Sequence, residues 1–310
     1  MSGNWREQRE RGGVIALRLI LWIARRLGRP VARALLYPIT LYFFLTSPSA
    51  RSASRDYLGR VTGQRVGMGQ VFRHLHAFAS VILDRVYFIA GETDKFDIRV
   101  HGYEAVADTM RSGGVILLGA HMGSFDAVRC MALDGYGVRL KVLMQHDHNQ
   151  LITRLLESIN PAVAKSVIPL GQPGSLLRAA EWLDEGGSVG MLGDRVVGDS
   201  RYSTCQFLGA PARFPTGPWL VARRLGVPVV LFFGCYRGGN RYDIRLEVVG
   251  RLPVDDPEDK HLHEAVRLYA NRLEGQVSEA PFNWFNFYDF WAEAVPRNAV
   301  RASGGSGRGQ

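Results

Sequence analysis

The feature that most constrains the fold is a regular alternation of short apolar runs and amphipathic segments from Phe96 onward. Runs typical of strands lie at 96–102, 115–119, 139–145, 166–170, 188–194, 227–236 and 242–250. Helical periodicity is found between them at 125–134, 150–159, 174–185, 216–225 and 259–278. Strands separated by helices of this length predict an α/β fold, a mixed sheet flanked by helices, in which sites lie at the carboxyl ends of strands.

We expect three regions along the chain. Residues 1–95 form a helical region, residues 96–300 form the α/β domain, and residues 301–310 form a disordered tail. Residues 51–95 place apolar side chains at helical spacing, with Gly91 marking the end of this segment. The tail, RASGGSGRGQ, is too polar and too rich in glycine to contribute to a core.

Basic residues are concentrated in the first fifth of the chain. Residues 1–65 contain twelve Arg and three acids, which gives +9, and this equals the net charge of the whole chain. The remaining residues are therefore neutral overall. Because these arginines are interleaved with apolar residues, we expect the region to contact an anionic membrane surface rather than nucleic acid.

The N-terminal apolar segment is short for a membrane-spanning helix. Its longest uncharged run, residues 34–50, has 17 residues and contains two prolines, whereas a spanning helix needs about 20 apolar residues. We therefore favour amphipathic helices that lie in the interface, which is peripheral or monotopic attachment. One spanning helix, and a helical hairpin that covers the protein's own core, stay open as alternatives.

Several classes of protein lack support in the sequence. The three cysteines, Cys130, Cys205 and Cys235, are far apart and form no C-x-x-C pair, so neither a disulfide framework nor a structural zinc site is indicated. The chain has no G-x-G-x-x-G after a strand and no P-loop, and its one G-x-S-x-G match, GGSVG at 186–190, leads into an expected strand and so does not form the strand-to-helix elbow of a nucleophile. These absences argue against dehydrogenases, P-loop kinases and α/β-hydrolases.

A histidine and an acid follow the most apolar strand. The stretch GGVILLGAHMGSFDAVRC runs from that strand into His121 and places Asp126 five residues later. If Ser124 caps a helix, Asp126 lies in its first turn, and the neighbouring glycines allow the carboxylate to reach back to the imidazole. Such a carboxylate would fix the His121 tautomer and leave the other ring nitrogen as a base. The alternative is structural: Asp126 interacts with the helix dipole and His121 with a backbone carbonyl.

The H-x-x-x-x-D pattern in GAHMGSFD resembles that of lysophospholipid and glycerolipid acyltransferases. The resemblance is closer to the bacterial lipid A lauroyl/myristoyl acyltransferases. Further stretches are similar in the same order: GGSVGMLGDR (186–195), FLGAPARFPTGPWLVARRLGVPVVLFF (207–233) and PFNWFNFYDFW (281–291). The resemblance spans roughly residues 10–292 and implies a glycerolipid acyltransferase-like fold.

This resemblance implies an O-acyltransferase on the cytoplasmic face of a bacterial inner membrane. It would move a fatty acyl group from an acyl carrier protein or coenzyme A thioester to a hydroxyl of a lipid or amphiphilic acceptor. The acceptor stays open among lipid A-like molecules, aminolipids and pigments. His121 would be the general base and Asp126 would orient it, with no cofactor beyond the acyl donor as co-substrate.

Four further residues are expected to bind substrate. Arg195 is a candidate for stabilising the oxyanion or contacting a phosphate, with a salt bridge to Asp194 as the alternative. Arg213, just before an expected helix start, is a candidate for an anionic substrate group. Asp194 and Gly123 are expected beside the reacting groups.

A metal site is the competing interpretation of the histidines. In MQHDHNQ, His146 and His148 share one face of an extended segment and could bind a metal together with His121. Two such ligands without a clear third make a weak site, so no metal is expected. A metal-dependent hydrolase and a non-catalytic membrane-binding protein nevertheless stay as alternative functions.

Overall fold

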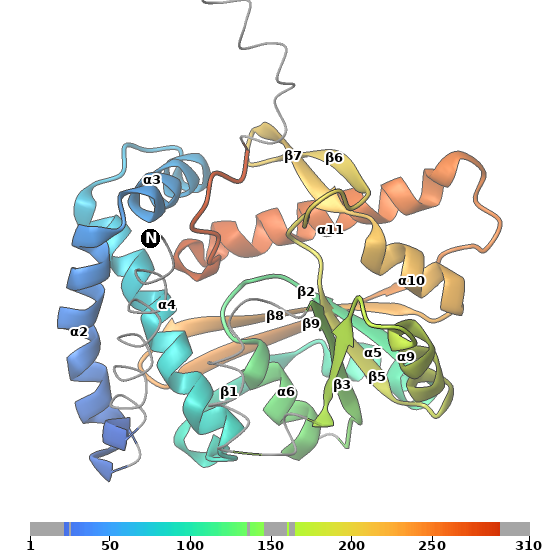
Figure 1. The fold of residues 1–310 in the computed structure, drawn as a ribbon, viewed down its shortest axis with the longest axis horizontal. Helices are drawn as coiled ribbons and strands as arrows, with labels where there is room; N and C mark the ends of the chain where they lie inside the picture. The colour runs from blue at the N-terminus through green and yellow to red at the C-terminus, as the bar shows by residue number, and fades with distance from the viewer. Residues whose placement is uncertain (1–21, 25, 135–136, 146–159, 161–164, 292–310) are drawn as a thin grey trace, which may run out of the picture.

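A central seven-stranded sheet organises the chain (Figure 1). The computed structural model describes residues 22–24, 26–134, 137–145, 160 and 165–291. The strand order is β1-β9-β8-β2-β5-β3-β4, and every neighbouring pair is parallel except the antiparallel pair β8–β9. The strands are β1 (Asp97–His101), β2 (Val115–Gly119), β3 (Leu140–Gln145), β4 (Val167–Leu170), β5 (Ser188–Leu192), β8 (Val229–Gly238) and β9 (Arg241–Gly250). The predicted mixed sheet flanked by helices is confirmed.

Helices cover the sheet and form the N-terminal region. They are α2 (Gly28–Thr46), α3 (Pro48–Thr62), α4 (Met68–Ile89), α5 (Tyr103–Arg111), α6 (Phe125–Asp134), α9 (Ser175–Asp184), α10 (Gly217–Leu225) and α11 (Lys260–Glu279), with short 3-10 turns η1 (Thr93–Lys95), η2 (Pro257–Asp259) and η3 (Pro281–Asn283). Four of the predicted helices begin and end within one residue of the expected positions. The helix expected at 150–159 and the tail expected at 301–310 lie outside the described residues.

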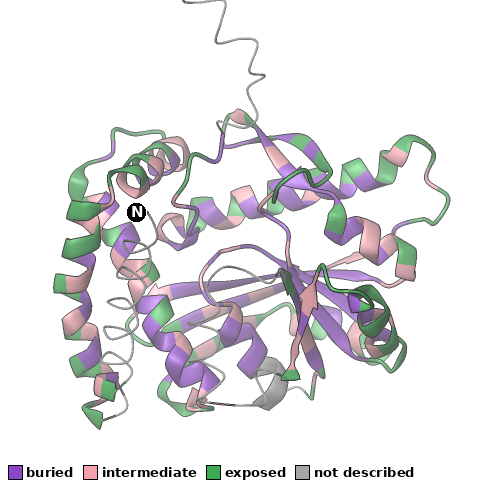
Figure 2. Ribbon diagram, in the orientation of Figure 1, coloured by how far each residue is buried: buried purple, intermediate pink, exposed green. Residues whose placement is uncertain are grey.

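Alternation along the strands builds two cores, one on each face of the sheet. In β2, Ile116 and Leu118 pack in a cluster with α3, α9, α10 and α11. Val115 and Leu117 pack on the opposite face in a cluster with α4, α5 and α6. Successive side chains of a strand point to opposite faces, so a strand buried on both sides is apolar throughout. The central strands β2, β5 and β8 are buried along most of their length, whereas the edge strand β1 has no buried residue (Figure 2).

The sequence patterns missed α5 and a two-stranded ribbon, β6 (Tyr202–Phe207) and β7 (Ala210–Pro215). Buried and exposed residues alternate along β6, as expected of a strand with one covered face. The hairpin turns at Leu208 and Gly209, both with positive φ. This turn lacks the usual Asn-Gly or Asp-Gly signal because a leucine takes the first left-handed position.

Helix α2 is attached to the rest of the protein through a buried carboxylate, Asp84 of α4. Arg29 donates to both Asp84 oxygens, at 2.7 and 2.8 Å, and Tyr242 donates its hydroxyl to the same group at 2.8 Å. Arg33 lies 3.8 Å from the carboxylate and donates to the Tyr236 hydroxyl at 2.6 Å. These two arginines therefore face the protein and do not contribute to the basic surface that is expected to contact an anionic membrane.

Helix α2 also carries large exposed apolar side chains. Those of the helix are Val31, Tyr37, Leu41, Tyr42, Phe43 and Leu45. Ala32, Leu36 and Thr40 are buried on its inner side. No helix within the described ranges has both the length and the apolar character needed to cross a membrane.

We expect Arg29→Ala to lower the free energy of unfolding by about 3–5 kcal/mol, because it leaves the Asp84 charge buried without its main partner. The matched control is Arg99→Ala, which removes an exposed ion pair with Asp97 and should have little effect on stability. Urea unfolding of both variants measures the difference. Equal, small losses would show that Asp84 does not hold α2 in place.

Candidate functional site

The register of two parallel strands brings His121 and Asp194 together. Gly119 at the end of β2 pairs with Leu192 at the end of β5. The residues two positions beyond these ends are His121 and Asp194. His121 Nδ1 lies 2.8 Å from Asp194 Oδ1, and the His121 backbone N–H donates to Oδ2 at 3.1 Å.

Asp194 is completely buried and accepts two further hydrogen bonds. Trp284 Nε1 donates to Oδ2 at 2.9 Å and Asn286 Nδ2 donates to the same oxygen at 3.1 Å. Burial opposes ionisation of this carboxyl, but the charge and hydrogen bond of His121, the charge of Arg195 and the Trp284 N–H outweigh it. Together they hold the pKa of Asp194 well below its ordinary value. The group is thus a carboxylate at neutral pH.

An ionised Asp194 determines the tautomer of His121. A carboxylate only accepts hydrogen bonds, so Nδ1 carries the proton and Nε2 keeps its lone pair. The His121 side chain is 31% exposed, and Nε2 has no hydrogen-bond partner among the residues described. The arrangement is a partly open imidazole base oriented by a buried carboxylate.

Asp126 does not make the contact predicted for it. Ser124 caps α6 as expected, its Oγ accepting the Ala127 N–H at 3.1 Å. The Asp126 carboxylate, however, pairs with Arg85 of α4 at 2.8 Å and lies 3.8 Å from Arg129.

The path of the turn before α6 explains this difference. Met122 forms a β-bridge with Trp284, and Phe285 donates its N–H to the His121 carbonyl at 2.8 Å. The turn is held against the 284–285 segment, so Asp194 and not Asp126 faces the imidazole. The expected pairing of His121 with Asp126 is wrong in this structure.

Gly123 has a structural reason to be glycine. Its φ is +58°, and a Cβ there would lie 1.9 Å from the Gly234 carbonyl oxygen. Its N–H already donates to the Asn283 carbonyl at 2.8 Å. The amide of Gly123 and the buried carboxylate of Asp194 are thus both occupied within the protein, which differs from the substrate contacts predicted for them.

Arg195 lies beside the site but forms no salt bridge with Asp194. Its Nε donates to Asn286 Oδ1 at 2.5 Å and its Nη2 donates to the Phe285 carbonyl at 2.8 Å. Arg195 therefore holds the same segment that supplies donors to Asp194. A guanidinium has five N–H donors, so others stay available to a ligand.

Arg213 lies apart from these residues. It belongs to β7, where its guanidinium stacks over the Tyr202 ring at 4.4 Å. Within the described part of the chain it makes no contact with His121 or Asp194. The structure does not bring it to the site formed by the strand ends.

His74 of α4 is a buried support that the sequence interpretation missed. Its side chain is fully buried between the Ser54 hydroxyl, 2.8 Å from Nδ1, and the Trp284 carbonyl, 2.9 Å from Nε2. Because a carbonyl only accepts, Nε2 donates to Trp284 and Nδ1 accepts from Ser54. Its place between Val71 and Leu75 on the apolar stripe of the helix is the sequence signal for this burial.

Trp284 and Asn286 were also missed as site residues. Both lie in an aromatic stretch whose side chains are mostly explained by packing. Only the fold shows that an indole N–H and an amide reach Asp194. With His74 on its carbonyl and Asp194 on its indole, Trp284 is held from two sides.

His74 should make stability depend on pH. Burial lowers the pKa of His74 to about 4, although the hydrogen bond with Trp284 opposes this shift, whereas an unfolded histidine has a pKa of about 6.5. The unfolded state then binds the proton first, so the stabilisation is complete above about pH 6.5 and is lost as pH falls toward 4. The loss is about 3 kcal/mol.

We expect His74→Gln, which retains an amide donor for Trp284, to remove most of this pH dependence. Urea unfolding at pH 7.5 and pH 4.5 measures it, with the exposed His101→Gln as control. A wild-type-like loss of stability in His74→Gln would show that His74 is not the group that titrates.

The histidines considered for a metal site cannot be placed with His121. His146 and His148 lie outside the described residues. Among the residues that are described, no three His, Cys, Asp or Glu side chains are grouped so that they could hold a metal ion.

The comparison with known families identifies the family of the chain. A family model described as bacterial lipid A biosynthesis acyltransferase matches residues 9–292. No curated protein matches the chain. The matched range includes His121, Asp194 and the 284–286 segment, and the resemblance inferred from the sequence motifs is confirmed. The chain belongs to the bacterial lipid A biosynthesis acyltransferase family.

Proposed function

We propose that this protein is an O-acyltransferase that moves a fatty acyl group from a thioester to a hydroxyl of a lipid or amphiphilic acceptor. The donor would be an acyl carrier protein or coenzyme A thioester, and the acceptor a lipid A-like molecule, an aminolipid or a pigment. The observation that carries this proposal is the 2.8 Å contact between His121 Nδ1 and Asp194, which leaves Nε2 as a base.

In this reaction Nε2 of His121 removes the proton of the acceptor hydroxyl as its oxygen attacks the thioester carbonyl. The tetrahedral intermediate then collapses, the carbon–sulfur bond breaks and the thiol leaves with the proton returned by the imidazolium. Asp194 stabilises the transient imidazolium from the buried side. Arg195, through N–H groups not bonded to Asn286 or Phe285, is our candidate for stabilising the oxyanion.

Each of two alternative functions can be tested by a specific experiment. A metal-dependent hydrolase would use His121 with His146 and His148, and elemental analysis of the purified protein would find the metal. A non-catalytic membrane-binding protein would keep its cellular role when His121 is replaced. For Arg213, a role with an anionic group of the substrate stays a prediction.

We also propose attachment to the cytoplasmic face of a bacterial inner membrane through α2. Its outer side exposes aromatic and aliphatic side chains, while its inner side is fastened to Asp84. Exposed apolar surface of this kind is typical of a partner or membrane contact. The helix would lie in the interface as a monotopic element.

We expect His121→Ala to lower the rate of acyl transfer by about 10²–10⁴-fold, the usual effect of losing a general base. Asp194→Asn should be strongly impaired because an amide does not stabilise the imidazolium. The double variant should be scarcely worse than His121→Ala, since the two residues act as a unit. Initial rates with a defined acyl thioester and detergent-dispersed acceptor measure these effects.

Asp126→Asn provides the discriminating comparison. If Asp194 is the partner of His121, Asp126→Asn retains more activity than Asp194→Asn in protein of equal thermal stability. The reverse order, with both variants folded, would restore Asp126 as the orienting acid and remove the role we assign to Asp194.

We expect replacing Tyr42, Phe43 and Leu45 together by Ser to weaken binding to anionic vesicles by about 100-fold or more. Each side chain contributes about 1.5–3 kcal/mol when buried, and about 1.4 kcal/mol is tenfold. Replacing Leu176 and Leu177, exposed on α9, by Ser is the control. Vesicle flotation measures binding, and full release of the wild type by high salt alone would contradict insertion of the apolar side.

A further inference from the structure

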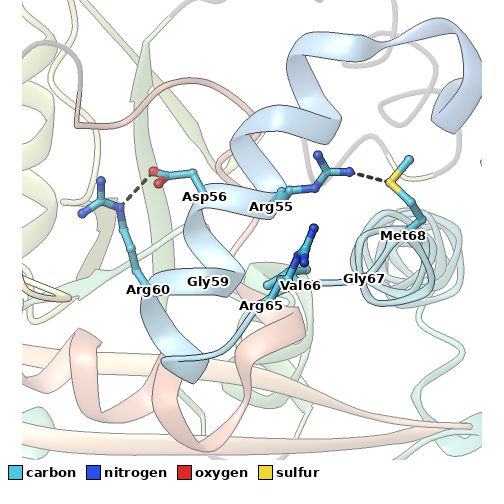
Figure 3. Close-up of a pocket in the computed structure, with 8 residues that line it drawn as sticks. All are labelled: Arg55, Asp56, Gly59, Arg60, Arg65, Val66, Gly67 and Met68. Carbon is cyan, nitrogen blue, oxygen red and sulfur yellow. Dashed lines mark hydrogen bonds and ion pairs between the residues drawn. The ribbon is translucent and has the colours of Figure 1, made fainter.

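The turn between α3 and α4 borders a basic cavity of about 680 Å³ that is open to solvent (Figure 3). Helix α3 lines one side and residues 65–68 line the other. Its charged side chains are Arg55, Arg60, Arg65 and Asp56. Three guanidinium groups thus share one hollow with a single carboxylate.

The ion pairs of this cavity leave two arginines without an anionic partner. Arg60 Nε pairs with Asp56 at 2.9 Å, which neutralises the only acid. Arg55 donates to Met68 Sδ at 2.6 Å, and a thioether is a weak acceptor. Arg65 has no side-chain partner among the described residues and lines the same cavity as Arg55 (Figure 3). The cavity therefore has two guanidinium groups with unused donors and uncompensated charge.

The other side of α3 is part of the support of the candidate site. Ser54 hydrogen-bonds His74, and the Tyr57 ring lies 5.1 Å from the Trp284 ring. Arg60 also stacks over the Trp291 ring at 4.3 Å. One helix thus borders the cavity on its outer side and contacts the residues around Asp194 on its inner side.

We propose that this cavity binds the phosphate ester group of a substrate, with Arg55 and Arg65 as its ligands. Forked guanidinium donors match phosphate oxygens in geometry as well as charge. The inference rests on the proposed function for the identity of the substrate. Two sources supply this chemistry: the phosphopantetheine arm that carries the acyl thioester, and the phosphate of a lipid headgroup.

The experiment compares ligands that differ only in the phosphate. Binding of 4′-phosphopantetheine against pantetheine, and of glycerol 3-phosphate against glycerol, is measured by calorimetry on the His121→Ala protein, so that no turnover is required. We expect one phosphorylated member to bind more tightly than its counterpart, and Arg55→Gln with Arg65→Gln to weaken it at least about tenfold. Preference for phosphopantetheine assigns the site to the donor, and preference for glycerol 3-phosphate assigns it to a headgroup.

Two further variants distinguish binding by the Arg55 and Arg65 guanidinium groups from nonspecific attraction by the net positive charge of the protein. Arg55→Lys with Arg65→Lys keeps the charge but loses the fork, and should bind between the wild type and the glutamine variant. Arg178→Gln with Arg251→Gln removes the same charge at exposed positions elsewhere and should change nothing. The proposal is overturned if neither phosphate is preferred, if the preference survives Arg55→Gln with Arg65→Gln, or if the control weakens it equally. Because binding is measured without turnover, such a failure leaves the role of His121 to be decided by its own kinetics.

Discussion

The structure depends on keeping one carboxylate charged where no water reaches it. Asp194 is fully buried, and an ionised group in that position is very costly unless hydrogen bonds and opposite charge surround it. Its two oxygens accept from the imidazole and backbone of His121, from the Trp284 indole and from the Asn286 amide. The strands, α4 and the 281–286 segment are arranged around this requirement. His74 holds the Trp284 carbonyl, and Arg195 holds Asn286.

Local patterns in the sequence predicted most of the elements but not which of them are neighbours. Apolar runs and helical spacing are local properties, and they predicted all seven strands of the sheet within a few residues. The positions of His121 and Asp194 at strand ends were also visible. Their pairing was not, because it requires β5 to lie beside β2, and strand order has no signature in periodicity. Asp126 was expected to be the partner because it follows the Ser124 cap and completes the H-x-x-x-x-D pattern, but contacts between residues 121–123 and 283–285 direct the turn elsewhere.

Two interpretations of the N-terminal helices, that they lie at a membrane interface and that they cover the protein's own core, are compatible. A helix has more than one side, and α2 packs Ala32, Leu36 and Thr40 inward while large apolar residues face outward. Arg29 and Arg33 were counted with the basic surface on composition alone. Their guanidinium groups instead reach Asp84 and Tyr236, because a long arginine side chain extends past the helix that carries it. Composition gives the amount of charge in a segment but not the direction in which it points.

The hydrogen bond between His74 and Trp284 joins residues 210 positions apart in the chain. Ribosomes add about 5–20 residues per second, so Trp284 is synthesised roughly 10–40 s after His74. The exposed apolar side of α2 has left the ribosome long before then. Asp194 likewise emerges before the indole and the amide that satisfy it. A nascent chain therefore exposes the apolar side chains of α2 while His121 and Asp194 still lack their supporting contacts, and the site is complete only after the last aromatic segment has been made.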